Sequence, residues 1–377
     1  MIKIGITGQA GFVGYHLYNT LLLDEKIQLV NFERSYFENT QQLETFVSNC
    51  DVIVHLAAMN RHKDPEVIFN TNINLVTKLV SACEKTNSSP HIIFSSSTQE
   101  SQDNLYGKSK KEGKNRLEEW AKNSTGKVTS LTIPNVFGAF GKPNYNSFIA
   151  TFCHKLTHGE TPTIINDANV NLIYVNELVS EFIGVIKKNI VTKKTGSSSF
   201  EYAVPHTSSK KVSEILNLLV SYKENYQEKG VFPSLEDSFE KALFNTFRCY
   251  VPQDHYPVSL EKHTDNRGSF VEIARTNTSG QFSFSTTVPG ITRGNHFHTR
   301  KAERFAVISG KALIQLRKIG TDEVIDYYLD GNEPSYVDMP IWYTHNIKNI
   351  GEEELITLFW INEPYNPADA DTYFENV

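Results

Sequence analysis

Four side chains in the last third of the chain have the types and the spacing of a metal site. In GITRGNHFHTRKAERFAVISG, residues 290–310, His296 and His298 are one residue apart and therefore lie on the same face of a strand. Glu303 on the next strand can face them, and His345 follows downstream in PIWYTHNIKN. Three imidazoles and a carboxylate suit one divalent metal ion, with Zn favoured and Ni, Fe or Mn as alternatives. A histidine on its own would more simply be a buried polar residue.

A glycine pattern near the start of the chain indicates a nucleotide site. In GITGQAGFVG, residues 5–14, the glycines stand between an apolar strand and a helix. Glycine permits the tight turn and lets backbone N–H groups at the helix start approach a pyrophosphate. The alternative is a glycine-rich turn in some other α/β protein. The residues expected to bind the cofactor are Gly8, Gly11, Phe12, Val13 and Gly14.

The end of the second strand bears on which cofactor is bound. An acidic residue at this place favours NAD by binding the ribose hydroxyls, whereas an arginine favours the 2′-phosphate of NADP. Both types are present here, as Glu33 and Arg34. We favour NADPH through Arg34; the alternative is that Arg34 is a solvated surface residue.

A Y-x-x-x-K pair, Tyr106 and Lys110, lies on one face of a charged amphipathic helix and follows the serines at 95–97. A lysine ammonium lowers the pKa of a phenol, so Tyr106 can pass a proton to or from a sugar or alcohol oxygen. A serine hydroxyl can steady that oxygen while hydride moves to or from a nicotinamide. We expect Lys110 to contact the cofactor as well.

The elements that position these residues fall into two regions. Strands and helices alternate over about the first 130 residues, which predicts a parallel sheet with helices on both faces. After about residue 250, short alternating strands and turns rich in glycine, asparagine and proline predict an antiparallel barrel. We therefore expect an α/β domain over 1–250 and an all-β domain over 251–377. The expected strands are 3–7, 28–32, 51–57, 91–95 and 128–133, and the expected helices 12–23, 73–84 and 105–122.

Composition excludes several classes of protein. A chain of 377 residues is long enough for two domains. Its net charge of −6 does not favour a nucleic-acid or membrane surface. Its 4 cysteines are scattered and are expected to be reduced, buried thiols. No apolar run approaches the ~18–20 residues of a membrane span. Because a strand begins at once, we expect no signal peptide and a cytoplasmic protein.

The first 250 residues resemble the extended short-chain dehydrogenase/reductase family, which uses a Ser/Thr-Tyr-Lys arrangement on nucleotide sugars. The resemblance rests on the glycine motif, DVIVHLAA, the serine-rich strand end and the tyrosine-lysine pair. It implies that Ser97 is the catalytic serine, with Ser96 second. In PNVFG, Asn135 would contact substrate or the active-site water network. Many relatives carry Arg before this Pro-Asn pair, where this chain has Thr132 and Ile133.

The last third resembles the cupin superfamily. The spacing G-x5-H-x-H-x4-E-x6-G, from Gly290 to Gly310, is similar to the first cupin motif. The second cupin motif departs from its usual pattern, because Trp342 stands where a glycine is expected. We expect this bulky residue to reshape the pocket.

DNRGSFVE, residues 265–272, resembles an element of the dTDP-4-keto-6-deoxyhexose 3,5-epimerases. Their catalytic histidine falls here on His296, a predicted metal ligand that cannot easily abstract a proton. Lys301, Tyr343 and a metal-bound hydroxide are alternative bases. Arg267 and Arg293 could bind nucleotide phosphates, or they could be solvated or structural.

From Met1 to Val377 the chain resembles the family of bifunctional capsular polysaccharide enzymes typified by CapF. The resemblance implies a substrate, a UDP-2-acetamido-2,6-dideoxy-hexos-4-ulose, that is epimerised at C3 by the cupin domain and reduced at C4 with NADPH. The product would be UDP-2-acetamido-2,6-dideoxy-β-L-talose, on the route to UDP-N-acetyl-L-fucosamine for capsule or O-antigen. A homodimer is also implied.

Two other functions stay open. In one, the cupin domain is only a binding or dimerisation module beside a simple nucleotide-sugar 4-ketoreductase. In the other, the chain is a non-catalytic sugar-nucleotide sensor, which would not need the serines, Tyr106 and Lys110 together. The metal could stabilise an enolate oxygen directly. We favour a mainly structural metal, because three His and one Glu fill a tetrahedral shell.

Overall fold

The chain passes three times between two units of structure. In the computed structural model, the first unit comprises Met1–Phe148 and Asp167–Val212, and the second Ile149–Asn166 and Ser213–Val377. The domain boundary expected at residue 250 stays a prediction; by their contacts, residues 213–250 group with the strands that follow them. The structure describes residues 1–191, 198–260, 262–265, 268–271, 274–276, 281–363 and 367–377.

The first unit is built on a six-stranded parallel sheet of order β2-β1-β3-β4-β5-β8. Its strands are β1 (Ile2–Thr7), β2 (Ile27–Val30), β3 (Val52–His55), β4 (His91–Ser97), β5 (Lys127–Ile133) and β8 (Ser199–Ala203). Its helices are α1 (Phe12–Leu22), α2 (Thr40–Ser48), α3 (Pro65–Thr86), α4 (Leu105–Lys122) and α6 (Val175–Val191), with short turns η1 (Arg34–Glu38) and η2 (Thr98–Ser101). A small sheet joins β6 (Asn135–Phe137), β7 (Asn169–Tyr174) and β9 (Ser208–Lys211). The predicted Rossmann-type sheet is thus confirmed.

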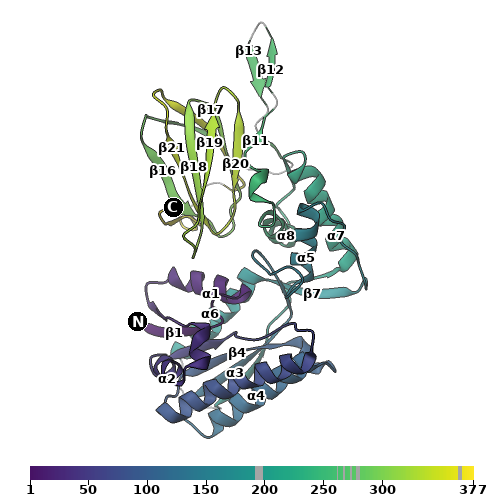
Figure 1. The fold of residues 1–377 in the computed structure, drawn as a ribbon, viewed down its shortest axis with the longest axis vertical. Helices are drawn as coiled ribbons and strands as arrows, with labels where there is room; N and C mark the ends of the chain where they lie inside the picture. Colours follow the sequence, from purple (N-terminus) through teal and green to yellow (C-terminus); the bar gives the residue numbers. More distant parts are fainter. Residues whose placement is uncertain (192–197, 261, 266–267, 272–273, 277–280, 364–366) are drawn as a thin grey trace. The chain divides into compact units, whose positions relative to one another are not determined.

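Helices cover both faces of this sheet because its apolar side chains alternate along each strand. Ile4 and Ile6 of β1 pack in one core with residues of α1 and α6. Ile53 and Phe94 point to the other face and pack with residues of α2, α3 and α4. Figure 1 shows α3 and α4 side by side along that second face.

Three local features of the first unit differ from the prediction. Helix α3 begins at Pro65 rather than at residue 73, because the Asp64 side chain accepts from the Glu66 N–H and proline suits the first helical turn. Helix α2 was not expected from the sequence. It has only a few apolar residues, and these are buried against residues of other elements in the core. Strand β4 continues through Ser97, so all three serines lie on it.

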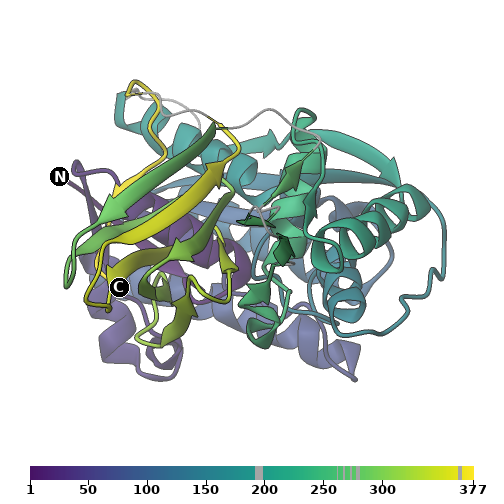
Figure 2. The same ribbon diagram turned by 90° about the horizontal axis from the view of Figure 1, so that it is seen from above.

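The second unit joins a helical layer to antiparallel sheets. The helical part contains α5 (Phe148–Thr157), α7 (Val212–Ser221), a π-helix η3 (Tyr222–Gln227), α8 (Ser238–Arg248) and η4 (Gln253–His255). One five-stranded sheet has the order β11-β20-β17-β22-β15 and the other β19-β18-β21-β16-β23, with antiparallel pairs throughout. The predicted all-β region is confirmed, and its green-to-yellow strands can be followed in Figures 1 and 2.

The strands of the second unit have the following bounds. The first sheet consists of β11 (Val258–Ser259), β15 (Gln281–Thr287), β17 (Glu303–Ser309), β20 (Ser335–Met339) and β22 (Leu355–Ile361). The second consists of β16 (Thr292–Phe297), β18 (Lys311–Lys318), β19 (Val324–Asp330), β21 (Tyr343–Asn349) and β23 (Tyr373–Phe374). Two small pairs join β10 (Val231–Phe232) to β14 (Arg275–Thr276) and β12 (Lys262–Asp265) to β13 (Gly268–Val271). Across the described residues, no helix has both the length and the apolar character that crossing a membrane would require.

A buried ion pair fastens the helical layer to the strands. Arg304 on β17 and Asp338 on β20 approach to 2.8 Å, and both side chains are 2% exposed. The Tyr226 hydroxyl, from the π-helix, donates to the same carboxylate, and the Tyr256 hydroxyl lies 3.3 Å from it. Burial alone would raise the pKa of Asp338, but the Arg304 guanidinium holds it below its usual range. The helical residues are therefore part of the second unit's core.

Replacing Asp338 with Asn should destabilise the second unit by about 3–5 kcal/mol, because Arg304 would stay buried without its partner charge. The matched control is Asp330→Asn in the same region, whose carboxylate lies 3.9 Å from the exposed Lys311 ammonium. That change should cost about 0–1 kcal/mol. Urea unfolding followed by tryptophan fluorescence measures both. Equal losses in the two variants would contradict the role of the buried pair.

Candidate functional site

In the first unit, a cavity of about 620 Å³ opens at the carboxyl ends of the parallel strands, where α/β sheets bind ligands. The cavity brings together the predicted cofactor and catalytic residues. It is lined by Gly8, Gly11, Phe12, Val13, Gly14, Ser97, Tyr106, Lys110 and Asn135, among others.

The glycine turn has the backbone that the motif predicts. Gly8 has φ +80°, and a Cβ there would lie 2.9 Å from the Ala57 nitrogen, so a larger residue does not fit. The Gly11 N–H donates to the Gly8 carbonyl at 2.9 Å. Gly11 is the N-cap residue of α1 and has no side chain to cap the helix. The first backbone N–H groups of α1 can therefore donate to an anionic ligand.

Tyr106 and Lys110 lie one turn apart on α4 and face the same cavity. The Lys110 ammonium is buried and donates to the Ser95 carbonyl at 2.8 Å. Burial lowers the pKa of Lys110 to about 8. Lys110 is therefore still mostly protonated at pH 7, although it loses its proton at a lower pH than a solvated lysine would.

The expected lowering of the tyrosine pKa is not found. Burial raises the pKa of Tyr106 to about 12, and the neighbouring Tyr145 adds to the shift. The Lys110 ammonium is bonded to a backbone carbonyl of β4 and lies 5.7 Å from the centre of the Tyr106 ring. Tyr106 consequently keeps its proton at neutral pH, which suits a proton donor.

The two candidate serines make different contacts. Ser96 donates to the Glu100 carboxylate, which also pairs with the Lys114 ammonium at 2.9 Å. Ser97 accepts from the Gln99 N–H at 3.2 Å and so begins η2. Its hydroxyl hydrogen is not used in any described contact, which favours Ser97 over Ser96 as the residue that donates to a ligand.

A second cavity of about 1150 Å³ adjoins the same glycines. Its lining includes Glu33 and Arg34, both exposed at the end of β2, so the structure leaves both cofactor types open. Arg61 lines both cavities and was missed from the sequence. Its signal was its position shortly after the third strand, at the carboxyl edge of the sheet.

Three further polar residues line the first cavity. Asn135, a predicted substrate ligand, donates to the Asn171 carbonyl at 3.2 Å. Tyr145, not predicted, accepts from the Asn60 N–H at 3.3 Å. The side-chain oxygen of Asn146 is buried without a hydrogen-bond partner in the described part of the chain. No motif pointed to Asn146, whose unsatisfied acceptor could receive a ligand N–H or O–H.

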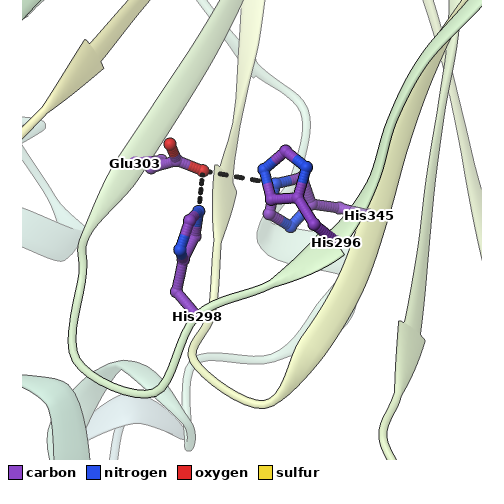
Figure 3. A group of neighbouring side chains, drawn as sticks. All are labelled: His296, His298, Glu303 and His345. Carbon is purple, nitrogen blue, oxygen red and sulfur yellow. Dashed lines mark ion pairs between the residues drawn. The ribbon is translucent and has the colours of Figure 1, made fainter. Parts of the chain in front are cut away.

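In the second unit, the four predicted metal ligands meet at one point (Figure 3). His296 on β16 and His345 on β21 belong to one sheet, whereas Glu303 begins β17 of the other and His298 follows β16. One ligand atom of each residue lies within 4.8 Å of the others. The Glu303 carboxylate lies 3.0 Å from His298 Nε2 and 3.2 Å from His345 Nε2.

The cluster has the electrostatics of a cation site. Despite burial, His298 lowers the pKa of Glu303, so this carboxylate is ionised although it is only 7% exposed. Burial lowers the pKa of His296 to about 4, with the other two imidazoles adding to the shift, so that ring is neutral. His298 Nε2, His345 Nε2 and Glu303 Oε2 have no hydrogen-bond partner among the described residues. Such buried acceptors fit a divalent metal ion.

A β-bulge aims His296 at the cluster. The pairing of β16 with β21 shifts between Gly294 and His296, which places His296 opposite His345. Gly294 has φ +105°, and a Cβ there would lie 2.8 Å from the His345 carbonyl. Asn295 also has a positive φ, of 60°. The bulge therefore depends on a glycine next to a ligand.

Trp342 replaces the glycine expected at its turn and keeps the glycine's backbone, with φ 60°. Its N–H donates to the His298 carbonyl at 2.9 Å, and its buried ring stacks on Phe297 at 5.5 Å. We infer that this packing compensates the left-handed conformation, which costs a large residue about 1–2 kcal/mol.

The side chains of the remaining predicted residues do not belong to the described cluster, although the Tyr343 backbone carbonyl lies 3.2 Å from His345 Nδ1. Lys301 is buried, and its ammonium donates to the Ala370 carbonyl. Tyr343 packs against the apolar core, and burial raises its pKa. Arg293 is exposed and donates to the Thr286 carbonyl at 3.1 Å. Arg267 lies outside the described residues. The roles foreseen for these four stay predictions.

Comparisons with known proteins cover both units. Residues 4–195 match the NAD dependent epimerase/dehydratase family, and residues 263–373 the Polysaccharide biosynthesis C-terminal domain. The chain is 32% identical to UDP-2-acetamido-2,6-beta-L-arabino-hexul-4-ose reductase from Pseudomonas aeruginosa, over 99% of this chain and 98% of that one. It is similar in structure to the capsular polysaccharide assembling protein CapF from Staphylococcus aureus, with TM-score 0.62 and 35% identity, covering 99% of this chain and 100% of that one.

A shorter relative matches only part of the chain. The spore coat polysaccharide biosynthesis protein SpsL from Bacillus subtilis is 28% identical over 122 residues, 30% of this chain and 81% of its own.

Lys110→Met should change how stability depends on pH. At pH 7 the folded protein holds a buried ammonium; above about pH 8 it releases that proton, while the unfolded chain keeps it up to about pH 10.5. Wild-type stability should therefore rise with pH across this window, relative to Lys110→Met, by up to about 3 kcal/mol. Urea unfolding at pH 7, 8.5 and 10 measures the difference. Lys108→Met, exposed on the same helix, should keep the wild-type slope, and an identical slope in Lys110→Met would refute the shift.

Proposed function

Because this chain belongs to the CapF family and, over residues 4–195, to the NAD dependent epimerase/dehydratase family, we propose that it is a bifunctional nucleotide-sugar enzyme. Its substrate is a UDP-2-acetamido-2,6-dideoxy-hexos-4-ulose. The strand-rich region, as a cupin, epimerises C3, and the parallel-sheet region reduces the C4 ketone with NADPH. The product is UDP-2-acetamido-2,6-dideoxy-L-talose, an intermediate toward UDP-N-acetyl-L-fucosamine for capsule or O-antigen.

One observation carries the reductase half: the glycine turn and the Ser97, Tyr106 and Lys110 side chains line one cavity. When bound, the nicotinamide supplies a hydride to C4. Tyr106 then donates its proton to the C4 oxygen, Ser97 donates a hydrogen bond to that oxygen, and Lys110 supports Tyr106 electrostatically. In this proposal Arg34 binds the 2′-phosphate of NADPH, and Arg61, which lines the same cavity, adds positive charge there.

The buried cluster supports the epimerase half. The C4 ketone acidifies the hydrogen on C3, so epimerisation passes through an enolate. We propose that His296, His298, Glu303 and His345 hold one divalent ion, Zn²⁺ by preference, whose main role is to brace the two sheets. The closed donor set supports the structural role. The base is left open, because Lys301 and Tyr343 both make structural contacts. We also propose a homodimer, as the family resemblance implies.

A simple 4-ketoreductase is the second candidate. The Pseudomonas aeruginosa relative is named only as a reductase of a hexul-4-ose, without an epimerase activity. In that case the strand-rich region would bind substrate or a second copy. The two candidates share the reductase cavity and differ in whether C3 exchanges its hydrogen.

The first experiment follows NADPH absorbance after a UDP-2-acetamido-2,6-dideoxy-hexos-4-ulose is added to the purified protein. Sugar-dependent oxidation supports the reductase. Absence of oxidation with both NADPH and NADH would mean that the substrate class is wrong or that the first unit only binds.

Tyr106→Phe should lower kcat for ketone reduction by roughly 10²–10⁴-fold, because the ring keeps its packing but loses the proton that reaches C4–O⁻. Steady-state NADPH oxidation measures the loss. Tyr202→Phe, whose hydroxyl bonds to Glu181 at 2.6 Å, should keep the wild-type rate. A normal rate in Tyr106→Phe would sink the assignment.

His298→Ala should abolish stoichiometric metal binding, measured by elemental analysis.

Incubation of the sugar with the protein in D₂O, without NADPH, should place deuterium at C3 in the wild type. A wild-type protein that exchanges nothing at C3 would favour the simple ketoreductase. A His298→Ala protein that stays stably folded and loses only the exchange would count against a purely structural metal.

A further inference from the structure

The turn that joins His298 to Glu303 is wrapped around one carboxylate. Asp371 accepts from the backbone N–H groups of Thr299 at 3.0 Å, Arg300 at 3.1 Å and Lys301 at 3.1 Å. It also accepts from the Thr299 hydroxyl at 2.7 Å. The Asp371 residue is 4% exposed, so these four bonds replace its water and fix the path of the turn.

Asp371 also determines which ring nitrogen of His298 points toward the other three residues of the cluster. His298 Nδ1 bonds to the Asp371 backbone carbonyl. A carbonyl can only accept, so Nδ1 carries a proton, and Nε2 is the nitrogen left to offer a lone pair to a metal ion. Nε2 is the atom that lies 3.0 Å from Glu303. The Asp371 backbone carbonyl therefore orients the His298 ring. Its side chain fixes the turn between His298 and Glu303, and so sets the separation of these two residues.

The residues after Asp371 hold the other ligand strands. Strand β23 pairs with β16, with Phe374 opposite His296. The Glu375 N–H donates to the Asn295 carbonyl at 3.0 Å, and its carbonyl accepts from the Thr344 hydroxyl, next to His345. The Tyr373 ring stacks on Phe297 at 5.3 Å. The segment thus touches residues beside each imidazole.

We propose that Asp371 is a positioning residue of the metal site, which sets the ligand geometry of His298 and Glu303. The inference rests on the proposed metal site. A carboxylate that only stabilised the fold would raise the stability of the metal-free protein and leave its affinity for metal unchanged. A positioning carboxylate changes the affinity for metal itself. Without it, the turn would be ordered only when the ion binds, and the free-energy cost of ordering the turn would weaken binding.

The test is the Kd of the metal-free protein for Zn²⁺, measured by competition with a chromophoric chelator. Asp371→Ala should weaken binding by roughly 10–100-fold, the usual effect of losing an outer partner of a metal ligand. Asp371→Asn keeps one acceptor oxygen and should show a smaller loss. The visible spectrum of the Co²⁺-loaded variants should also change, because the ligand geometry is altered. Circular dichroism of the metal-free proteins controls for folding.

Asp369→Asn is the matched control. Its carboxylate pairs with Arg300 of the same turn at 2.8 Å, but on the exposed side. It should keep the wild-type Kd within about twofold, since a rim charge contributes little. A folded Asp371→Ala protein with wild-type Kd and an unchanged Co²⁺ spectrum would overturn the inference while leaving the metal site standing. If the unchanged protein bound no metal, the site and the inference would both fall. Should Asp371→Ala not fold, Asp371→Asn decides in the same terms.

Discussion

A charged group that is taken out of water must find a partner, and this constraint governs both units. In the first unit, the Lys110 ammonium donates to the Ser95 carbonyl, so the face of α4 that carries Tyr106 is held against β4. In the second, Arg304 and Asp338 pair between two strands and draw a tyrosine from the helical layer into the core. Glu303 is buried among imidazoles. Each buried charge thus joins separate elements of the fold, and two of the three stand at a candidate site.

Three residues with a left-handed backbone lie around the candidate metal site of the second unit. Asn295, Trp342 and Asp371 all have positive φ without being glycine. Each makes a bond or a turn next to a ligand: the bulge before His296, the bond to the His298 carbonyl, and the acceptor for the His298 ring. Such conformations cost roughly 1–3 kcal/mol each and persist only where surrounding contacts determine them. Their concentration here indicates that ligand placement, rather than the barrel alone, has shaped this end of the sheets.

The sequence predicts features that depend on local spacing. The glycine turn, the pair on α4 and the His296–His298 pair follow from periodicity, because neighbours in sequence stay neighbours on a strand or helix. Glu303 and His345, on other strands, were expected from their residue types and the resemblance to the cupin motif. It fails where contacts come from afar. Residues 140–240 are mixed and hard to interpret from the sequence, since some of their apolar side chains meet distant strands; the Phe232 ring, for example, packs on Trp360 with the ring centres 4.4 Å apart. The raised pKa of Tyr106 depends on burial, and Asn146 and Asp371 become significant only through neighbours that no motif specifies.

The order of synthesis gives the Asp371 contacts another meaning. A ribosome makes β16, β17 and β21 before it makes the residues that clasp them, so all four ligand side chains exist while His298 still lacks its backbone acceptor. Strand β16 likewise lacks its pairing partner on one edge until β23 has been synthesised. Domains fold as units while a chain emerges. The cluster in Figure 3 can therefore take its final form only after residues 371–375 have been translated.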